Sequence, residues 1–249
     1  MKRLLAESLS NLITTTGGAV VGTSLGSSNI GAAVGALLNP VATSILMQVM
    51  GDRQKSRLEQ VVTSARAQIE DSWIKQTPFR QDMTEEDFAN LFEGALLKAK
   101  DTYEALKVSL LANLVARAPF TNTPIQDLLQ TLIDLSSLSF RQICILSIVD
   151  QSHFPQPVIK LSNKSYKDEY HSDLKIGEQG TYEDILFLLN TGLLYQVEEN
   201  LLIPIPTCFQ IVPAQLELSY RGRLLCIGAS LYKIDPEQLS PIIAALAAQ

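Results

Sequence analysis

The sequence predicts a mainly α-helical protein that ends in a smaller α+β module. Three observations predict this: an uncharged glycine-rich start, amphipathic helical periodicity from residue 52 onward, and short strand-like runs after residue 200. The chain has 249 residues, of which 46% are hydrophobic and 18% charged, so it is large and apolar enough to build a core. We expect three domains: a glycine-rich, uncharged helical hairpin (1–51), a helical bundle (52–136) and a winged-helix-like module (137–249).

The amino-terminal block is defined by missing charges. No Asp, Glu, Lys or Arg occurs from Ser8 to Gly51, and seven of the 13 glycines of the chain fall there. Several of these glycines are four residues apart, which places them on one face of a helix, where two helix backbones can approach closely. We therefore predict a membrane or oligomer interface, with a kink at the proline. The predicted interface residues are Gly18, Gly22, Gly26, Gly31, Gly35 and Pro40.

The same block contains a segment long enough to span a membrane. Ile30–Met50 has the length of a bilayer span, whereas Leu9–Leu25 is diluted by polar residues. Lys and Arg residues flank both ends, so a hairpin would keep both ends on the cytoplasmic side. Two interpretations stay open: a small-residue helix pair buried in a soluble fold or an oligomer, or a hairpin that inserts into lipid after activation. The expected location is cytoplasmic, with association to the inner membrane on activation.

Patterns for catalysis are weak. Gly22-Thr23-Ser24-Leu25-Gly26 has the GxSxG form of serine hydrolases, but too little chain precedes Ser24 to build the sheet that this motif requires. The three cysteines, Cys144, Cys208 and Cys226, have apolar neighbours and no CxxC spacing, so we expect reduced core thiols. We predict that the protein is not an enzyme, with no catalytic residue, no metal site and no cofactor.

The middle of the chain follows helical periodicity. A first helix should run from Asp52 toward Thr77-Pro78, and a second should begin at Thr84, which forms a capping box with Asp87. A third is expected at 102–116, and a fourth starts at Thr123-Pro124. The predicted core residues are Leu58, Val61, Val62, Ala65, Ile69, Phe88, Leu91, Phe92, Ala95, Leu96, Leu106, Leu110, Leu111, Leu114, Val115, Leu128, Leu129, Leu132 and Ile133.

The carboxyl-terminal module combines helices with short strands. Helices are predicted at 139–150 and 181–190, with a turn at 191–194. Strands are predicted at 201–204 and 215–219, and further helices at 222–231 and 239–248. Two helices, a turn, a β-ribbon and another helix form the order of a winged helix-turn-helix.

The charges of this module disfavour DNA. The charged residues between Gly177 and Asn200 are all acidic, and the chain has a net charge of -6, so phosphate would be repelled. We therefore predict no nucleic-acid partner and a protein-binding surface instead. That predicted surface consists of Glu183, Asp184, Glu198 and Glu199. A transcriptional regulator remains a lesser alternative, and it would need a basic surface made of Lys160, Lys164, Lys167 and Lys175.

Three segments in this order resemble a known group of bacterial proteins. They are Tyr103-Glu104-Ala105-Leu106-Lys107, Leu111-Ala112-Asn113-Leu114 and Leu138-Ser139-Phe140-Arg141-Gln142-Ile143-Cys144. The region 52–231 is similar to the abortive-infection alpha-type family, whose members are found near phage-defence genes. The resemblance implies a role in defence or controlled cell death and no particular chemistry. The long glycine block is a departure from it and is this chain's expected effector element.

Two functions follow as expectations. The first is a non-enzymatic defence effector whose hairpin permeabilises the inner membrane after activation, for example by proteolysis. The second is a soluble oligomeric adaptor with a protein-binding winged helix. The expected partners are a second copy of the chain, an activating protein or protease, and inner-membrane lipid.

Overall fold

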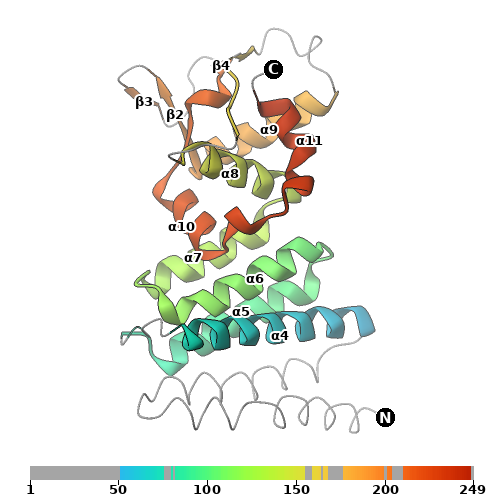
Figure 1. Ribbon diagram of the computed structural model, residues 1–249, viewed down its shortest axis with the longest axis vertical. Coiled ribbons are helices and arrows are strands. Elements are labelled where there is room, and N and C mark those ends of the chain that lie inside the picture. Colours follow the sequence, from blue (N-terminus) through green and yellow to red (C-terminus); the bar gives the residue numbers. More distant parts are fainter. Residues whose placement is uncertain are drawn as a thin grey trace. The chain divides into compact units, whose positions relative to one another are not determined.

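The computed structural model describes residues 51–75, 80, 82–154, 159–163, 165–167, 176–198, 201–203 and 210–247 (Figure 1). The described part is mainly helical, as the sequence predicts, with short antiparallel strands only after residue 165. The predicted hairpin, with Gly18, Gly22, Gly26, Gly31, Gly35 and Pro40, lies outside the described residues. The chain divides into two compact units, 1–136 and 137–249.

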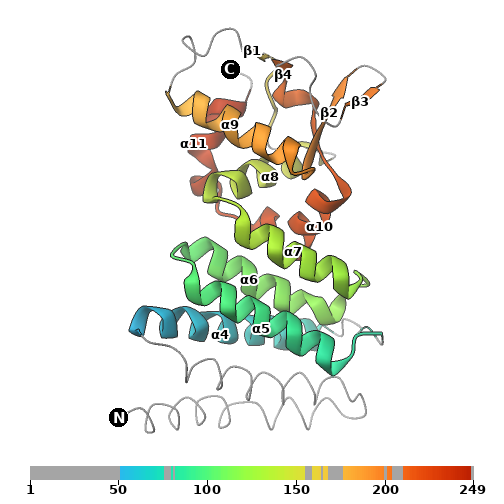
Figure 2. The same ribbon diagram turned by 180° about the vertical axis from the view of Figure 1, so that it is seen from behind.

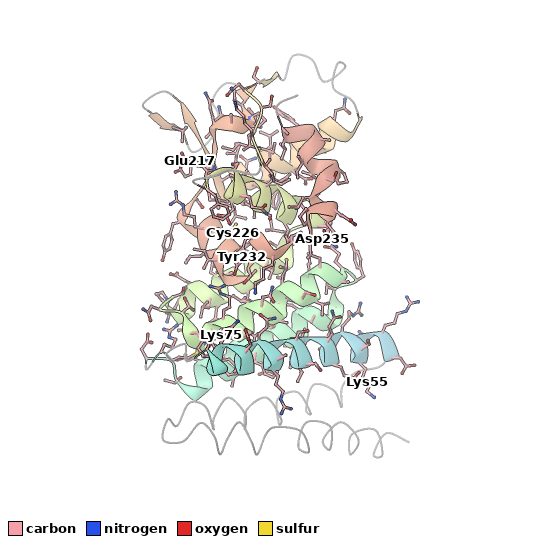
Figure 3. The ribbon with its side chains drawn as sticks, in the orientation of Figure 1. Lys55, Lys75, Glu217, Cys226, Tyr232 and Asp235 are labelled. Atoms are coloured by element: carbon pink, nitrogen blue, oxygen red, sulfur yellow. The ribbon has the colours of Figure 1, made fainter. Side chains whose placement is uncertain are left out.

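The described part of unit 1 is built from four α-helices and one short 3-10 turn. They are α4 (Asp52–Ile74), α5 (Glu85–Asp101), α6 (Ala105–Arg117), η2 (Ala118–Phe120) and α7 (Ile125–Ser137). The first three pack side by side, with α4 on both α5 and α6 (Figure 1). Gln68 of α4 donates a hydrogen bond of 2.7 Å to the amide oxygen of Asn113 on α6. Lys55 and Lys75 mark the two ends of α4 (Figure 3).

The predicted apolar stripes form the core of unit 1. All predicted core residues of α4 and α5 are buried, as are Leu110, Leu111, Leu114 and Val115 of α6. The prediction for α7 was partly wrong: Leu128 and Leu132 are buried, but Ile133 is 54% exposed and Leu135 is fully buried. The buried line therefore runs 128, 132, 135 at the helical period, and Ile133 lies about 100° away from Leu132 around the helix.

The capping box predicted at Thr84 is confirmed. The Thr84 hydroxyl accepts the Asp87 backbone N–H, and the Asp87 carboxylate accepts the Thr84 backbone N–H at 3.1 Å. Arg80, in the segment before this cap, is buried, which its sequence context did not indicate. Its guanidinium binds the carboxylate of Asp82 and the carbonyl oxygen of Thr123. These contacts link the segment before α5, which contains Arg80 and Asp82, to Thr123 in the turn before α7.

Unit 2 is organised around α8 (Phe140–Ser152), in which every residue from Ile143 to Val149 is buried. Around it pack α9, α10, α11, the 3-10 turn η5 and the strand β5. Their bounds are α9 (Ile176–Asn190), α10 (Tyr220–Gly228), η5 (Leu231–Lys233) and α11 (Pro236–Leu246). In Figure 2, α9 runs across the near side of unit 2, in front of α8.

Two small antiparallel sheets complete unit 2. In the first, β2 (Leu194–Glu198) lies between β3 (Leu201–Ile203) and β5 (Leu216–Leu218). In the second, β1 (Tyr166–Lys167) pairs with β4 (Gln210–Ile211), and the 3-10 turn η4 (Pro213–Gln215) follows β4. The strands predicted near 201–204 and 215–219 are therefore present as β3 and β5, whereas β2 was not predicted.

Several helix boundaries differ from the prediction: α6 begins at Ala105 and not at 102, α11 begins at Pro236 and not at 239, and α9 and α10 differ as follows. Helix α9 begins at Ile176 and not at Thr181, and Thr181 is buried inside it. Helix α10 begins at Tyr220, because Ser219 caps it by accepting the Gly222 backbone N–H. Gly222 is required here, since a Cβ at this position would overlap the backbone carbonyl oxygen of Leu193.

Candidate functional site

Two of the four residues of the predicted acidic surface, Glu183 and Asp184, lie on α9, and their surroundings differ. Glu183, Phe187 and Asn190 are exposed at spacings of four and three residues, so they form one face of the helix. Phe187 is 40% exposed, although it lies in the last turn of a helix whose other described large apolar residues are mostly buried. Residues 176–190 contain no Lys or Arg. The exposed face of α9 therefore presents an acid, an aromatic ring and an amide.

Asp184 does not belong to this surface. It is 7% exposed, and its carboxylate accepts hydrogen bonds from Arg141 Nε and, at 2.8 Å, from Gln142 Nε2, both on α8. The prediction that Asp184 is a binding residue is corrected on this point, because its charge is already matched inside the unit. Glu183, the adjacent acid, stays exposed. Of the other two predicted residues, the side chain of Glu198 and all of Glu199 lie outside the described residues.

A close helix contact orients the Arg141–Asp184 pair. The guanidinium of Arg141 lies against Gly180, where an added Cβ would come within 2.6 Å of Arg141 Nη1. Four residues separate Gly180 from Asp184, so one turn of α9 supplies both the space and the counter-charge. The capping box of Ser139 and Gln142 fixes the start of α8 at the same place. This cluster fastens α8 to α9 and leaves Glu183 and Phe187 on the outside.

The carboxyl end of α9 carries a cation from another helix. Gly192 adopts a left-handed backbone with φ of 72°, which ends the helix. Arg221 of α10 is exposed, and its Nη1 donates a hydrogen bond of 3.2 Å to the carbonyl oxygen of Thr191. Helix carboxyl ends attract cations, because their last carbonyl groups point outward. Arg221 therefore lies at the carboxyl-terminal end of α9.

A second polar group lies on the sheet. The Tyr195 hydroxyl of β2 donates a hydrogen bond of 2.5 Å to Glu217 of β5, and Arg223 Nη2 of α10 lies 3.8 Å from the same carboxylate (Figure 3). The hydrogen bond to Glu217 raises the pKa of Tyr195 above its ordinary value. A tyrosine with a raised pKa is a poor general base near neutral pH. We interpret the contacts of Tyr195, Glu217 and Arg223 as structural: they join β2 to β5 and β5 to α10.

Two described titratable groups of unit 2, Cys226 and Asp150, have raised pKa values because of burial. Cys226 is buried, and desolvation raises the pKa of its thiol well above the ordinary value (Figure 3). A thiol in that state is not the thiolate that nucleophilic chemistry requires. Desolvation also raises the pKa of Asp150, at the end of α8. Cys144 and Cys226 are buried and in no disulfide, as predicted, and Cys208 lies outside the described residues.

The described residues form neither a metal cluster nor a membrane-spanning helix. No group of three His, Cys, Asp or Glu side chains is placed to hold a metal ion there. Within the same residues, no helix combines the length and the apolar composition that a bilayer crossing needs. Comparison with family models, curated proteins and solved structures gave no match to the chain.

Proposed function

We propose that the protein is a non-enzymatic effector whose glycine-rich amino-terminal block associates helix to helix and permeabilises a membrane. One observation carries the proposal: 44 consecutive residues, Ser8–Gly51, contain no charged side chain and bring glycines to four-residue spacing. Glycines at this density disfavour an isolated helix in water by about 1 kcal/mol each relative to Ala. Close helix packing in lipid or in an oligomer offsets that cost.

The properties of α4, the helix that follows the block, support separate roles for the glycine-rich block and for the folded body. Charges resume at Asp52 and Arg53, both exposed in the first turn of α4. The face of α4 that points away from α5 and α6 includes Ser56, Gln60 and Thr63, all exposed and polar. The remainder of α4 joins the core of unit 1 through Leu58 and its neighbours in the stripe. In our proposal the body of the protein stays folded in water, while the glycine-rich block enters the membrane.

Leakage of dye from vesicles tests the proposal. Vesicles of phosphatidylethanolamine and phosphatidylglycerol are treated with the full chain and with Gly22→Val and Gly35→Val variants. We expect both substitutions to reduce leakage by about tenfold, because a valine separates the packed helices. Gly51→Val is the matched control, since an added Cβ at Gly51 has no atom within 4 Å. Equal leakage from all four proteins would rule the proposal out.

The sequence offers a way to imitate proteolytic activation. Trypsin can cleave after Arg3 and after Arg53, and no Lys or Arg lies between them, so the segment 4–53 would be released whole. If an activating protease is the trigger, limited trypsin treatment should increase leakage, and chymotrypsin, which cleaves at leucines inside the block, should not. An unchanged leakage after tryptic release of this segment would argue against proteolytic activation and leave other triggers.

We propose, from the resemblance of residues 52–231 to the abortive-infection alpha-type family, that this activity serves bacterial defence. Within the proposal, phage infection provides the signal, and the inner membrane is the target. Cell fractionation before and after phage challenge tests the location, with the full chain moving from the soluble to the membrane fraction. A protein that stays in the soluble fraction while infected cells die would count against membrane action.

A soluble adaptor is the second candidate, favoured by the exposed face of α9. Apart from the two-residue strand β1 between α8 and α9, the order α8, α9, β2, β3 is the order of helices and ribbon in a winged helix, which we propose for unit 2. The third strand, β5, follows the ribbon here, whereas it precedes the second helix in the usual arrangement. Glu183 and Phe187 suit a protein partner better than phosphate. Under this proposal the glycine block joins copies in water, and light scattering of the Gly22→Val variant should report smaller particles without detergent.

A further inference from the structure

The exposed side of α4 has the residue spacing of a helix–helix contact. We call it the outer face of α4, and it consists of the exposed residues Ser56, Gln60, Thr63 and Ala67. Their spacings of four, three and four residues are those by which one helix packs along another. Three of the four side chains are small, which allows a second helix to come close. Helices α5 and α6 are not that second helix, because they pack on the opposite side of α4, where Leu58 and its stripe are buried.

The outer face also lacks the charges that a surface helix usually turns toward water. Three charged residues of the same turns, Lys55, Glu59 and Arg66, lie about a quarter-turn to one side and are only partly exposed. Lys55 and Glu59 pair with one another there at 3.7 Å. A face that is uncharged and mildly polar suits an uncharged helix, and it tolerates water when that helix leaves.

Arg57 borders the outer face on its other side. It lies three residues before Gln60, so the two side chains are neighbours on the helix surface. Its Nε is buried and has no hydrogen-bond partner among the described residues. A buried N–H without an acceptor costs about 1–3 kcal/mol. A segment that covers the outer face can supply the acceptor, and the glycine-rich block, Ser8–Gly51, contains many Ser and Thr hydroxyls.

The length and the end point of the glycine-rich block match the outer face. The block ends directly before α4, and the chain bends at Gly51. Its 44 residues are enough for two helices of about 20 residues, each about 30 Å long. Helix α4 has 23 residues and is about 34 Å long. A block that folds back at Gly51 therefore spans the outer face from end to end, and neither side brings a charge to the contact.

We propose that, before activation, the glycine-rich block folds back on its own chain and covers the outer face of α4, with glycines against the small side chains of Ser56, Thr63 and Ala67. Activation then releases the block and makes it available to the membrane. This docked state rests on the proposed function, because it regulates the same block. The docking itself is measured in water without lipid, so its failure is distinguishable from a failure of membrane action.

Thiol reactivity tests whether the outer face is covered. With Cys208 replaced by serine, the full chain carrying Gln60→Cys is treated with a water-soluble maleimide, and Asn90→Cys, on the exposed side of α5, is the matched control. Cys144 and Cys226 are buried and should not react. We expect Gln60→Cys to react at least about tenfold more slowly than Asn90→Cys, because labelling requires the block to leave. Equal rates in folded proteins would overturn the proposal.

A cross-link identifies what covers the face. Positions equally far from Gly51 lie side by side in a fold-back, which pairs Ala42 with Gln60. In the background without Cys208, we expect a bis-maleimide about 10 Å long, the diameter of a helix, to link Ala42→Cys to Gln60→Cys within one chain. Ala42→Cys with Asn90→Cys is the control and should not be linked. A product with the mass of two chains would assign the face to a second copy and overturn the proposal, as would the absence of any link.

A charge on the outer face should release the block. Ala67→Arg places a guanidinium without a partner in the contact. We expect leakage from phosphatidylethanolamine–phosphatidylglycerol vesicles to rise by about tenfold without protease, and the reactivity of Gln60→Cys to rise with it. Asn90→Arg is the matched control and should change neither.

The two measurements separate the two proposals. If Ala67→Arg makes Gln60→Cys reactive and no variant causes leakage, the docking stands and the proposed membrane function fails. If Gln60→Cys stays slow to react in a folded Ala67→Arg protein, the docking on the outer face of α4 is overturned.

Discussion

At the scale of single residues, adjacent acids on α9 have opposite roles. Asp184 is buried and bound by Arg141 and Gln142, while Glu183 is exposed. Replacing Asp184 with alanine removes the acceptor and leaves Arg141 without its counter-charge. We expect a loss of about 2 kcal/mol in the free energy of unfolding, measured by urea titration. Glu183→Ala is the matched control and should change it by less than about 0.5 kcal/mol. Equal effects at both positions would contradict this assignment.

Three glycines provide a graded test of close packing. A Cβ at Gly222 would overlap the Leu193 backbone carbonyl, which cannot move without displacing the start of β2. At Gly94 the nearest atom is Leu132 Cδ2 at 2.8 Å, the end of a side chain that can shift, and at Gly51 there is none within 4 Å. Thermal unfolding of the alanine variants should show losses of about 3 kcal/mol at Gly222, about 1 kcal/mol at Gly94 and none at Gly51. A Gly222→Ala variant as stable as the unmodified protein would show that the Leu193 carbonyl can move to make room for the added Cβ.

Asp150 makes the stability of unit 2 depend on pH. Burial raises its pKa in the folded protein, partly opposed by the nearby charges of His153 and Arg223. The folded state therefore binds the proton more tightly than the unfolded chain does. The resulting stabilisation is complete below the unfolded pKa of Asp and is lost as pH rises through the folded pKa.

Asparagine at this position should remove that dependence. Because an asparagine side chain carries no charge at any pH, Asp150→Asn should raise the free energy of unfolding at pH 7 and have little effect at pH 3. Urea titrations at both pH values measure the difference between the two proteins. A variant that is less stable than the unmodified chain at pH 7 would mean that the ionised carboxylate of Asp150 is favoured in the fold.

At the scale of elements, local sequence signals are reliable where the element supplies its own hydrogen bonds. The Thr84–Asp87 box could be predicted because both partners lie within one turn. Thr84→Ala should cost about 1 kcal/mol of stability, since it exposes an unpaired N–H at the start of α5. Thr63→Ala, at an exposed position inside α4, is the control and should have little effect in the same thermal melts. Equal melting temperatures for both variants would indicate that water replaces the cap.

The missed strand shows where local signals fail. In β2 the buried position between Tyr195 and Val197 is Gln196, so the alternation of apolar and polar residues is hidden. Its amide oxygen accepts the Val212 backbone N–H at 3.2 Å, and its amide nitrogen donates to Gln215 at 3.3 Å. These partners are 16 and 19 residues away. A buried glutamine is tolerated in β2 because the folded unit supplies hydrogen-bond partners for its side-chain amide.

At the scale of the whole molecule, the two units differ in how well sequence predicts them. The helices of unit 1 follow one another with short connections, and their stripes could be assigned by periodicity alone. Three predicted core residues are exceptions: Leu106 and Leu129 are only partly buried, and the exposed Ile133 belongs to a helix whose apolar residues are more numerous than the buried face requires. Unit 2 brings distant segments together: β5 pairs with β2 from about 20 residues away, and Ser147 of α8 donates to the Leu231 carbonyl oxygen at 2.9 Å.

The sequence by itself determined the helical character of this protein, the core stripes of α4 and α5, the cap at Thr84 and the uncharged glycine block, because each depends on residues within a few turns of one another. Only the tertiary structure decided that Asp184 is an internal counter-ion, that Gln196 belongs in a strand, and that Arg221 lies at the end of α9. The sequence does not distinguish the adjacent acids Glu183 and Asp184. Their roles differ because α8 supplies the Arg141 cation to Asp184, whereas Glu183 is exposed to solvent.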